Sequence, residues 1–206
     1  MMRKVVLVLG TFNPITNAHL ELGIKAASLI PDADVYYVPS NLKFMHKWKS
    51  VENFLTDEDR LILTNNVVKE YCFYVSDIEL IGYLDGKTYN TVEYFRKELC
   101  YNEVYICCGY DKLKELHKWY KADELLEENK FLLFERGNKK LKDCDCPFIE
   151  KYSDSFIEVE MEDRTQDISS TVVRKAYKEN KLQEIKGIVP EVVYDYLVEK
   201  RKNNGI

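Results

Sequence analysis

The chain has 206 residues, of which 46% are hydrophobic and 32% are charged. This composition is typical of a folded globular protein and excludes a largely disordered chain. The net charge of −5 argues against broad nucleic-acid binding through the overall field of the protein. Since no apolar stretch approaches the roughly 18 residues that span a bilayer, we expect a cytoplasmic protein with no nucleic-acid or membrane partner.

Six cysteines lie without the regular spacing of a secreted disulfide framework, so we expect reduced thiols. Cys144 and Cys146 form a CxC pair, but no second pair of cysteines or histidines lies at zinc-site spacing, and we predict no metal site made by the protein. The length fits a single domain over residues 1–206, with a C-terminal helical part from about residue 168.

The first predicted unit is a strand that leads through a sharp turn into a helix. Residues 5–9, VVLVL, form a continuous apolar run typical of a strand buried on both faces of a parallel sheet. Gly10 ends this run, and Pro14 disfavours a helical conformation at Asn13. Thr16 or Asn17 can then cap a helix over about 18–30. Free N–H groups at such a turn, with the positive end of the helix dipole, favour an anion, most commonly phosphate.

His19 falls in the first turn of this helix, where its ring can face the same anion. The local pattern alone leaves a second interpretation open, because a histidine near a helix start is more often a surface or packing residue.

The rest of the chain alternates strands and helices. Strands are predicted over residues 35–38, 73–75, 78–81, 104–109, 131–137 and 156–159. Helices are predicted from Thr56 to about 71, over 89–99, over 112–129 as one helix or two around Trp119, over 170–180 and over 190–202. The alternation predicts an α/β fold with a Rossmann-like, doubly wound parallel sheet and a C-terminal helical appendage.

Two further segments have the character of ligand sites. The strand over 104–109 ends in Gly109 and is followed by Asp111, an arrangement typical of ligand contact in an open α/β sheet. Ser169 and Ser170 precede the helix over 170–180, and Arg174 lies about one turn inside it, which predicts a second anion site. One ligand with several phosphates explains both anion sites better than two ligands do. The chain lacks the GxxxxGK[ST] loop of P-loop kinases and the GxGxxG turn of dinucleotide dehydrogenases.

Two motifs carry a resemblance to a known family. GTFNPITNAHL resembles the (G)xFxPxxxxH signature of the HxGH-type nucleotidylyltransferases, and DISSTVVRKA resembles the ISSTxxR signature of the nicotinamide or nicotinate mononucleotide adenylyltransferases. The segments VPSNLKFMHK, TYNTV, CGYDKL and LHKWYKADELL are similar to family segments between them. Two positions depart from the pattern: Thr16 stands where bacterial nicotinate enzymes often have a first histidine, and Asn90 where many members have aspartate.

The resemblance implies attack by the 5′-phosphate of a pyridine mononucleotide on the α-phosphorus of ATP, with Mg²⁺ bridging phosphate oxygens. It implies catalytic roles for His19 and Arg174. The implied ATP contacts are Gly10, Thr11, Phe12, Thr16, His19, Gly109, Asp111, Ile168, Ser169, Ser170, Thr171 and Arg174. The implied mononucleotide contacts are Phe12, Asn13, Lys47, Thr88, Thr91 and Trp119.

Several alternatives stay open on the sequence. Trp119 beside Tyr120 can be packing, Asp111 can cap a helix, and Lys47 can belong to a solvated loop. The choice between nicotinate and nicotinamide mononucleotide is open, as is the formation of a homo-oligomer. Competing functions are another adenylyltransferase or cytidylyltransferase of the superfamily, such as the pantetheine-phosphate enzyme, and a nucleotide-binding regulator without turnover.

Overall fold

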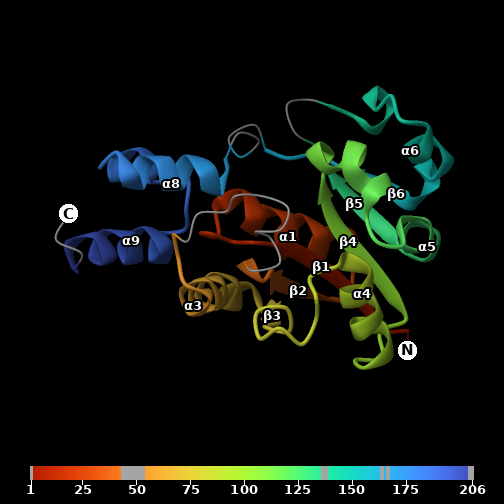
Figure 1. The fold of residues 1–206 in the computed structure, drawn as a ribbon, viewed down its shortest axis with the longest axis horizontal. Coiled ribbons are helices and arrows are strands. Elements are labelled where there is room, and N and C mark those ends of the chain that lie inside the picture. Colours follow the sequence, from red (N-terminus) through yellow and green to blue (C-terminus); the bar gives the residue numbers. More distant parts are fainter. Residues whose placement is uncertain (1, 43–53, 136–138, 163–164, 166–167, 204–206) are drawn as a thin grey trace.

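The computed structural model describes residues 2–42, 54–135, 139–162, 165 and 168–203. Within this part, six strands form one parallel sheet in the order β3-β2-β1-β4-β5-β6 (Figure 1). The strands are β1 (Lys4–Gly10), β2 (Ala33–Pro39), β3 (Tyr74–Val75), β4 (Glu103–Gly109), β5 (Lys130–Phe134) and β6 (Phe156–Val159). The expected doubly wound parallel sheet is confirmed.

Helices supply the crossover connections that a parallel sheet requires. The α-helices are α1 (Asn17–Leu29), α3 (Asp57–Val68), α4 (Thr88–Lys97), α5 (Ala122–Glu128), α6 (Pro147–Lys151), α8 (Ser170–Lys178) and α9 (Glu191–Asn203). The 3-10 helices are η1 (Lys69–Tyr71), η2 (Tyr110–Lys118), η3 (Leu141–Asp143), η4 (Ser153–Ser155) and η5 (Leu182–Ile185).

The central strands bury both of their faces, which explains their continuously apolar sequences. In β1, Val6 and Val8 pack into a core with residues of α1, α3, α8 and α9, whereas Val5 and Leu7 pack into a second core with residues of α4, α5 and α6. Because successive side chains of a strand point to opposite faces, the two cores lie on opposite sides of the sheet.

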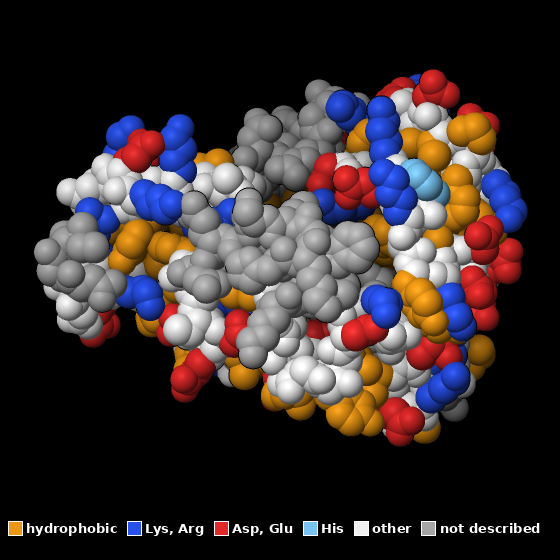
Figure 2. Space-filling model, in the orientation of Figure 1, with side chains coloured by type: hydrophobic (Ala, Val, Ile, Leu, Met, Phe, Trp, Pro, Cys, Tyr) orange, Lys and Arg blue, Asp and Glu red, His pale blue; other side chains and the backbone are white. Residues whose placement is uncertain are grey.

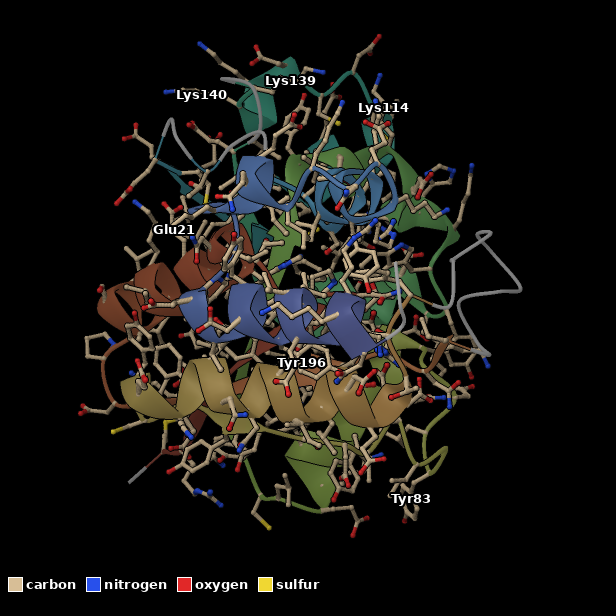
Figure 3. All side chains as sticks on the ribbon, turned by 90° about the vertical axis from the view of Figure 1, so that its left-hand side faces the viewer. Glu21, Tyr83, Lys114, Lys139, Lys140 and Tyr196 are labelled. Carbon is tan, nitrogen blue, oxygen red and sulfur yellow. The ribbon has the colours of Figure 1, made fainter. Side chains whose placement is uncertain are left out.

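The C-terminal helices close over the first of these cores. Arg201 of α9 donates a hydrogen bond to the carbonyl of Tyr177, the residue before the end of α8. Lys200 of α9 bonds the carboxylate of Asp59 in α3 at 3.0 Å, and Figure 3 shows Tyr196 at the seam between these two helices. The helical appendage predicted from the sequence is therefore packed against the sheet domain, at one end of the view in Figure 1.

One prediction from the sequence is wrong, and for another the structure decides between the two alternatives left open. The strand predicted over residues 78–81 is wrong: this segment forms turns, with Ile81 bonded to the carbonyl of Asp77 at 3.0 Å and 65% exposed, before Gly82 takes a φ of 75°. The helical region predicted over 112–129 divides into η2 and α5, with Trp119 between them.

The outer surface carries mixed charge. On the face shown in Figure 2, Lys and Arg side chains are interspersed with Asp and Glu side chains, in keeping with the small net charge. Among the helices of the described residues, none has the length and apolar character required to cross a membrane.

Candidate active site

The candidate site lies where the strand order of the sheet reverses, between β1 and β4. Both strands end in glycine, Gly10 and Gly109, at the same carboxyl edge. Their pairing runs from Lys4 opposite Glu103 to Leu7 opposite Ile106, so it stops three residues before each strand ends. Ligands of open α/β sheets bind outside the carboxyl ends of the strands at such a switch point.

The turn after β1 has no room for a side chain at Gly10. A Cβ atom there would lie 2.8 Å from Cε1 of Phe12, whose ring folds back beneath the turn. Phe12 has a φ of 44° and is only 1% exposed, and the peptide bond between Asn13 and Pro14 is cis. The side chain of Phe12 is therefore enclosed by the protein.

His19 is the third residue of α1 and forms a capping box with Thr16. Its Nδ1 accepts a hydrogen bond from the backbone N–H of Thr16 at 3.1 Å and lies 2.9 Å from the Thr16 hydroxyl. Because a neutral imidazole carries one proton, an accepting Nδ1 assigns that proton to Nε2. Thr16 is fully buried, so its side chain orients His19.

The helix α8 contacts this turn through hydrogen bonds, although about 150 residues separate the two segments. The Ser170 hydroxyl donates to the carbonyl of Pro14 at 2.8 Å, and Arg174 Nη1 donates to the carbonyl of Asn13 at 3.0 Å. Arg174 Nη2 also donates to the Thr171 hydroxyl at 3.0 Å. The two segments that were predicted to bind anions are thus in direct contact.

The start of α8 is capped in the predicted manner. Ser169 is the N-cap, and its hydroxyl accepts from the backbone N–H of Val172 at 3.5 Å. Ile168, Ser169 and Ser170 are half-buried, and Thr171 is exposed. A helix start of this kind is suited to an anion because its first N–H groups lack partners within the helix.

The end of β4 brings a carboxylate to the same edge. A Cβ atom at Gly109 would lie 2.6 Å from Oδ1 of Asp111, so the Asp111 side chain folds back over the glycine. Asp111 also pairs with Lys112 at 2.8 Å and is exposed. A side chain at Gly109 would displace this carboxylate, which can accept hydrogen bonds from a ligand hydroxyl.

The residues predicted to bind the mononucleotide differ in how far they are buried. Thr88 begins α4, and Trp119 is half-buried against the core on the α4 side of the sheet. Thr91 is fully buried and its hydroxyl donates to Glu79 Oε1 at 2.7 Å. Lys47 lies outside the described residues.

Asn13 is also enclosed by the protein. Its side chain is fully buried, and its Oδ1 accepts from the backbone N–H of Leu55 at 3.1 Å. Together with the bond from Arg174 to its carbonyl, this arrangement makes Asn13 a link between the turn, α8 and the segment before α3. The direct ligand contacts expected of Asn13 and Thr91 stay predictions.

The structure adds two polar residues that the sequence analysis did not single out. Arg60 in α3 is fully buried, and its Nη1 donates to the carbonyls of Thr11 and Ser40. Glu79 is 2% exposed, and burial raises the pKa of its carboxyl group, partly offset by Thr91 and Ser40. Arg60 occurs in a polar stretch and Glu79 is a single charged residue in an apolar one, so only their partners in the fold distinguish them from surface residues.

Metal ligands do not gather in the described part of the chain. No group of three or more His, Cys, Asp or Glu side chains is placed there to hold a metal ion.

Known proteins resemble this chain in sequence, and solved structures resemble it in fold. A family model described as cytidylyltransferase-like matches residues 7–176. A "probable nicotinate-nucleotide adenylyltransferase" of Clostridium acetobutylicum is 30% identical over 205 residues, covering 98% of each chain. A protein of the same description from Clostridium tetani is 29% identical over 204 residues, covering 95% of this chain and 96% of that protein.

Solved structures show the same fold at lower identity. Plasmodium falciparum nicotinic acid mononucleotide adenylyltransferase complexed with NaAD superposes with a TM-score of 0.75, at 19% identity, over 97% of this chain and 96% of that chain. The same enzyme complexed with APC also gives a TM-score of 0.75, at 20% identity and the same coverage.

Proposed function

Because the chain belongs to the cytidylyltransferase-like family, and within it to the nicotinate and nicotinamide mononucleotide adenylyltransferases, we propose that it transfers the adenylyl group of ATP to nicotinate mononucleotide. An oxygen of the mononucleotide 5′-phosphate forms a bond to the α-phosphorus of ATP. The bond from that phosphorus to the oxygen of the β-phosphate breaks, and pyrophosphate leaves. The names of both clostridial relatives support nicotinate rather than nicotinamide mononucleotide as the acceptor.

The observation that carries this proposal is the direct contact between α8 and the turn after β1. Arg174 and Ser170 hold the carbonyls of Asn13 and Pro14, which places a cation and a helix start beside His19. A transfer between phosphates needs no nucleophile from the enzyme; it depends on positioning and on donors aimed at the oxygens where charge develops.

In this mechanism His19 donates from Nε2–H to a non-bridging oxygen of the α-phosphate. The backbone of Gly10, Thr11 and Phe12 forms the turn that admits this phosphate. Arg174 and the start of α8, with Ile168, Ser169, Ser170 and Thr171, bind the departing pyrophosphate. A guanidinium has five N–H donors in a planar fork, which allows it to hold backbone carbonyls and a phosphate at once.

The nucleosides occupy the two sides of the switch point. The Asp111 carboxylate accepts from the ribose of ATP above Gly109, where the absence of a side chain permits the approach. Trp119 stacks on the pyridine ring, and Thr88 and Lys47 bind the mononucleotide. Mg²⁺ would enter with ATP as part of the substrate, where it would offset negative charge on the phosphates and take few ligands from the protein.

The state of the cysteines supports a reducing compartment. All six cysteines are free thiols, and burial raises the pKa values of Cys107 and Cys108. Reduced cysteines are the rule in the cytosol, and we place the protein there.

A substrate panel tests the proposed function. Pyrophosphate release is measured with ATP and, in turn, nicotinate mononucleotide, nicotinamide mononucleotide and phosphopantetheine, with CTP replacing ATP in a parallel series. We expect the largest kcat/KM with ATP and nicotinate mononucleotide. Preference for nicotinamide mononucleotide would overturn the acceptor, and activity only with CTP or phosphopantetheine would overturn the function.

Substitution of His19 tests its role in turnover. We expect His19→Ala to lower kcat by a factor of about 10² to 10⁴, with a much smaller loss of ATP affinity, because the donor acts mainly on charge that develops in the transition state. His117→Ala is the matched control, since His117 is exposed on η2, and it should keep wild-type kinetics. Equal losses of kcat and ATP affinity in His19→Ala would show a simple binding residue instead.

A further inference from the structure

Arg60 is a cation enclosed by the protein directly behind the phosphate turn. Its side chain is 0% exposed and lies in α3 rather than in either sequence motif. Nη1 donates to the carbonyl of Thr11 at 2.6 Å and to that of Ser40 at 2.9 Å, while Nη2 bonds Asp57 at 2.6 Å. Burying a charge is unfavourable unless it is paired and hydrogen-bonded, so this position requires an explanation.

The two carbonyls belong to neighbouring loops at the carboxyl edge of the sheet. Thr11 follows β1 and Ser40 follows β2. The backbone N–H of Ser40 also donates to the carbonyl of Gly10 at 2.8 Å. Arg60 thereby fixes the distance between the turn that is proposed to admit the α-phosphate and the loop that leaves β2.

The same bond orients the backbone of the turn. The carbonyls of Gly10, Thr11, Asn13 and Pro14 each accept a hydrogen bond from another part of the protein. No hydrogen bond joins the N–H groups of Thr11 and Phe12 to another residue in the described ranges. With the carbonyls held by the protein and N–H groups left for a ligand, the turn favours an anion over a cation.

The positive charge of Arg60 also favours an anion at the turn. Its acidic partner Asp57 is 44% exposed, so solvent screens that carboxylate more than the enclosed guanidinium, and Arg60 Nε is buried without a hydrogen bond. Only the peptide of Thr11 separates the guanidinium from the turn. A bound polyphosphate would add negative charge near a cation whose acidic partner, Asp57, is itself partly exposed to solvent.

We propose that Arg60 is a positioning residue for the nucleotide phosphates: it holds the carbonyls of Thr11 and Ser40 so that the turn presents its N–H groups to the α-phosphate. This role rests on the proposed adenylyl transfer for its kinetic consequence. Its binding consequence, a loss of ATP affinity when Arg60 is replaced, stands without turnover.

The test compares Arg60→Lys and Arg60→Met with a matched control. Arg96→Met is the control, because Arg96 also pairs with an acidic residue, Glu128 at 2.6 Å, but extends from α4 on the opposite side of the sheet. Each protein is measured well below its own melting temperature, so that the kinetic constants describe folded molecules. ATP binding is measured by calorimetry in the absence of a mononucleotide, and kcat and KM by pyrophosphate release.

We expect Arg60→Met to weaken ATP binding about 10-fold or more and to lower kcat/KM for ATP about 100-fold, with a smaller loss in Arg60→Lys, which keeps the charge and one donor group. Arg96→Met should match the wild type in both measurements. Wild-type ATP affinity and kcat/KM in folded Arg60→Lys and Arg60→Met would overturn the inference, since a residue that serves stability alone lowers only the melting temperature.

Two further outcomes are also decisive. If Arg60→Met does not fold, Arg60→Lys decides alone: ATP affinity reduced at least about threefold supports the inference, and unchanged affinity overturns it. If the wild type binds ATP but releases no pyrophosphate with any acceptor, the proposed function fails. A loss of ATP affinity in the Arg60 variants would then still support the positioning role, and its absence would overturn that role too.

Discussion

Glu79 places a carboxyl group between the hydroxyls of two different segments. Thr91 of α4 donates to its Oε1 at 2.7 Å, whereas Oε2 is buried without a well-formed hydrogen bond, with the Ser40 hydroxyl nearby. Burial raises the pKa of Glu79 above its ordinary value because the charged form loses hydration. The backbone carbonyl of Glu79 also accepts from the side chain of Asn41 at 3.2 Å, so this residue ties the segment before α4 to the end of β2.

The raised pKa predicts how stability depends on pH at this residue. The unfolded chain releases the proton at the ordinary pKa of glutamate, while the folded protein retains it to higher pH. Wild-type stability is therefore lost as pH rises from the unfolded pKa through the folded one. We expect Glu79→Gln, which keeps an acceptor for Thr91 but carries no charge, to melt above the wild type near pH 8, with the difference closing as pH falls toward about 4.

Glu93→Gln is the control for this series and should show the opposite trend. Burial alone would raise the pKa of Glu93, but Lys97 and Arg96 together lower it, so its contribution is present above the unfolded pKa and is lost on acidification. Glu93→Gln should therefore melt below the wild type near neutral pH and approach it in acid. A melting difference for Glu79→Gln that stays constant across this pH range would contradict the assignment of a buried, raised pKa.

At the scale of elements, local sequence predicted most helices and strands because local bonds form their ends. Thr56 caps α3, and its hydroxyl accepts from the N–H of Asp59 at 3.0 Å, as the sequence pattern indicated. Ser169 caps α8 in the same way. The segment over 78–81 differs because its apolar residues are not all buried: Ile81 points to solvent, so an apolar run was not evidence of a strand there.

Hydrogen bonds of Glu21 tether the segment that leads to α8, which the local pattern did not indicate. Glu21 of α1 is 8% exposed and accepts hydrogen bonds from the backbone N–H of Glu162 at 2.8 Å and from the Thr165 hydroxyl. These donors lie in the segment that leads from β6 to α8. Glu21 is two residues after His19, so the tether joins the helix of the first motif to the chain that enters the second.

Loss of this tether is expected to affect both stability and ATP binding. Glu21→Ala removes the acceptor of two hydrogen bonds, from the Glu162 backbone N–H and the Thr165 hydroxyl, which together contribute about 1–3 kcal/mol to the unfolding free energy. Because α8 is then less firmly placed, ATP affinity should fall as well. Both effects can be measured by denaturant unfolding and by calorimetry.

Lys25→Ala serves as the control for the tether. Lys25 pairs with Glu21 at 3.6 Å and is partly exposed, so its removal should cost no more than about 1 kcal/mol and should leave ATP affinity unchanged. If Glu21→Ala lost stability yet bound ATP as the wild type does, the tether would support the fold without helping to place α8.

At the scale of the whole molecule, the sequence predicted the sheet and contained the two motifs, but it did not reveal the hydrogen bonds that position them. The order of strands and the crossovers determine that Gly10 and Gly109 reach one edge. By contrast, Arg60 bonds the carbonyl of Thr11, 49 residues away, and Glu79 bonds Thr91 of α4, and no periodicity reveals such partners. Thr16 differs, because its partner His19 is only three residues away and forms a local capping box with it.

We propose that residues 1–206 form one cooperative domain, in which the C-terminal helices do not unfold separately. Leu197 of α9 is fully buried in the core that also contains Val6 of β1, whereas Trp119 packs into the core on the other side of the sheet. Leu197→Ala should lower the unfolding free energy by about 2–5 kcal/mol, and the melting temperature by roughly 2–4 °C for each kcal/mol.

Trp119 reports whether that loss reaches the opposite core. In a Trp48→Phe background, Trp119 is the remaining tryptophan, so its fluorescence follows its own core, while far-ultraviolet circular dichroism follows all helices. For one cooperative unit, both signals should shift by the same temperature in Leu197→Ala and stay coincident. Val192→Ala, at a position of α9 that is 40% exposed, should shift neither signal appreciably. A Leu197→Ala protein that lost helical signal first, with Trp119 melting at the wild-type temperature, would instead identify the helical part as a separately unfolding unit.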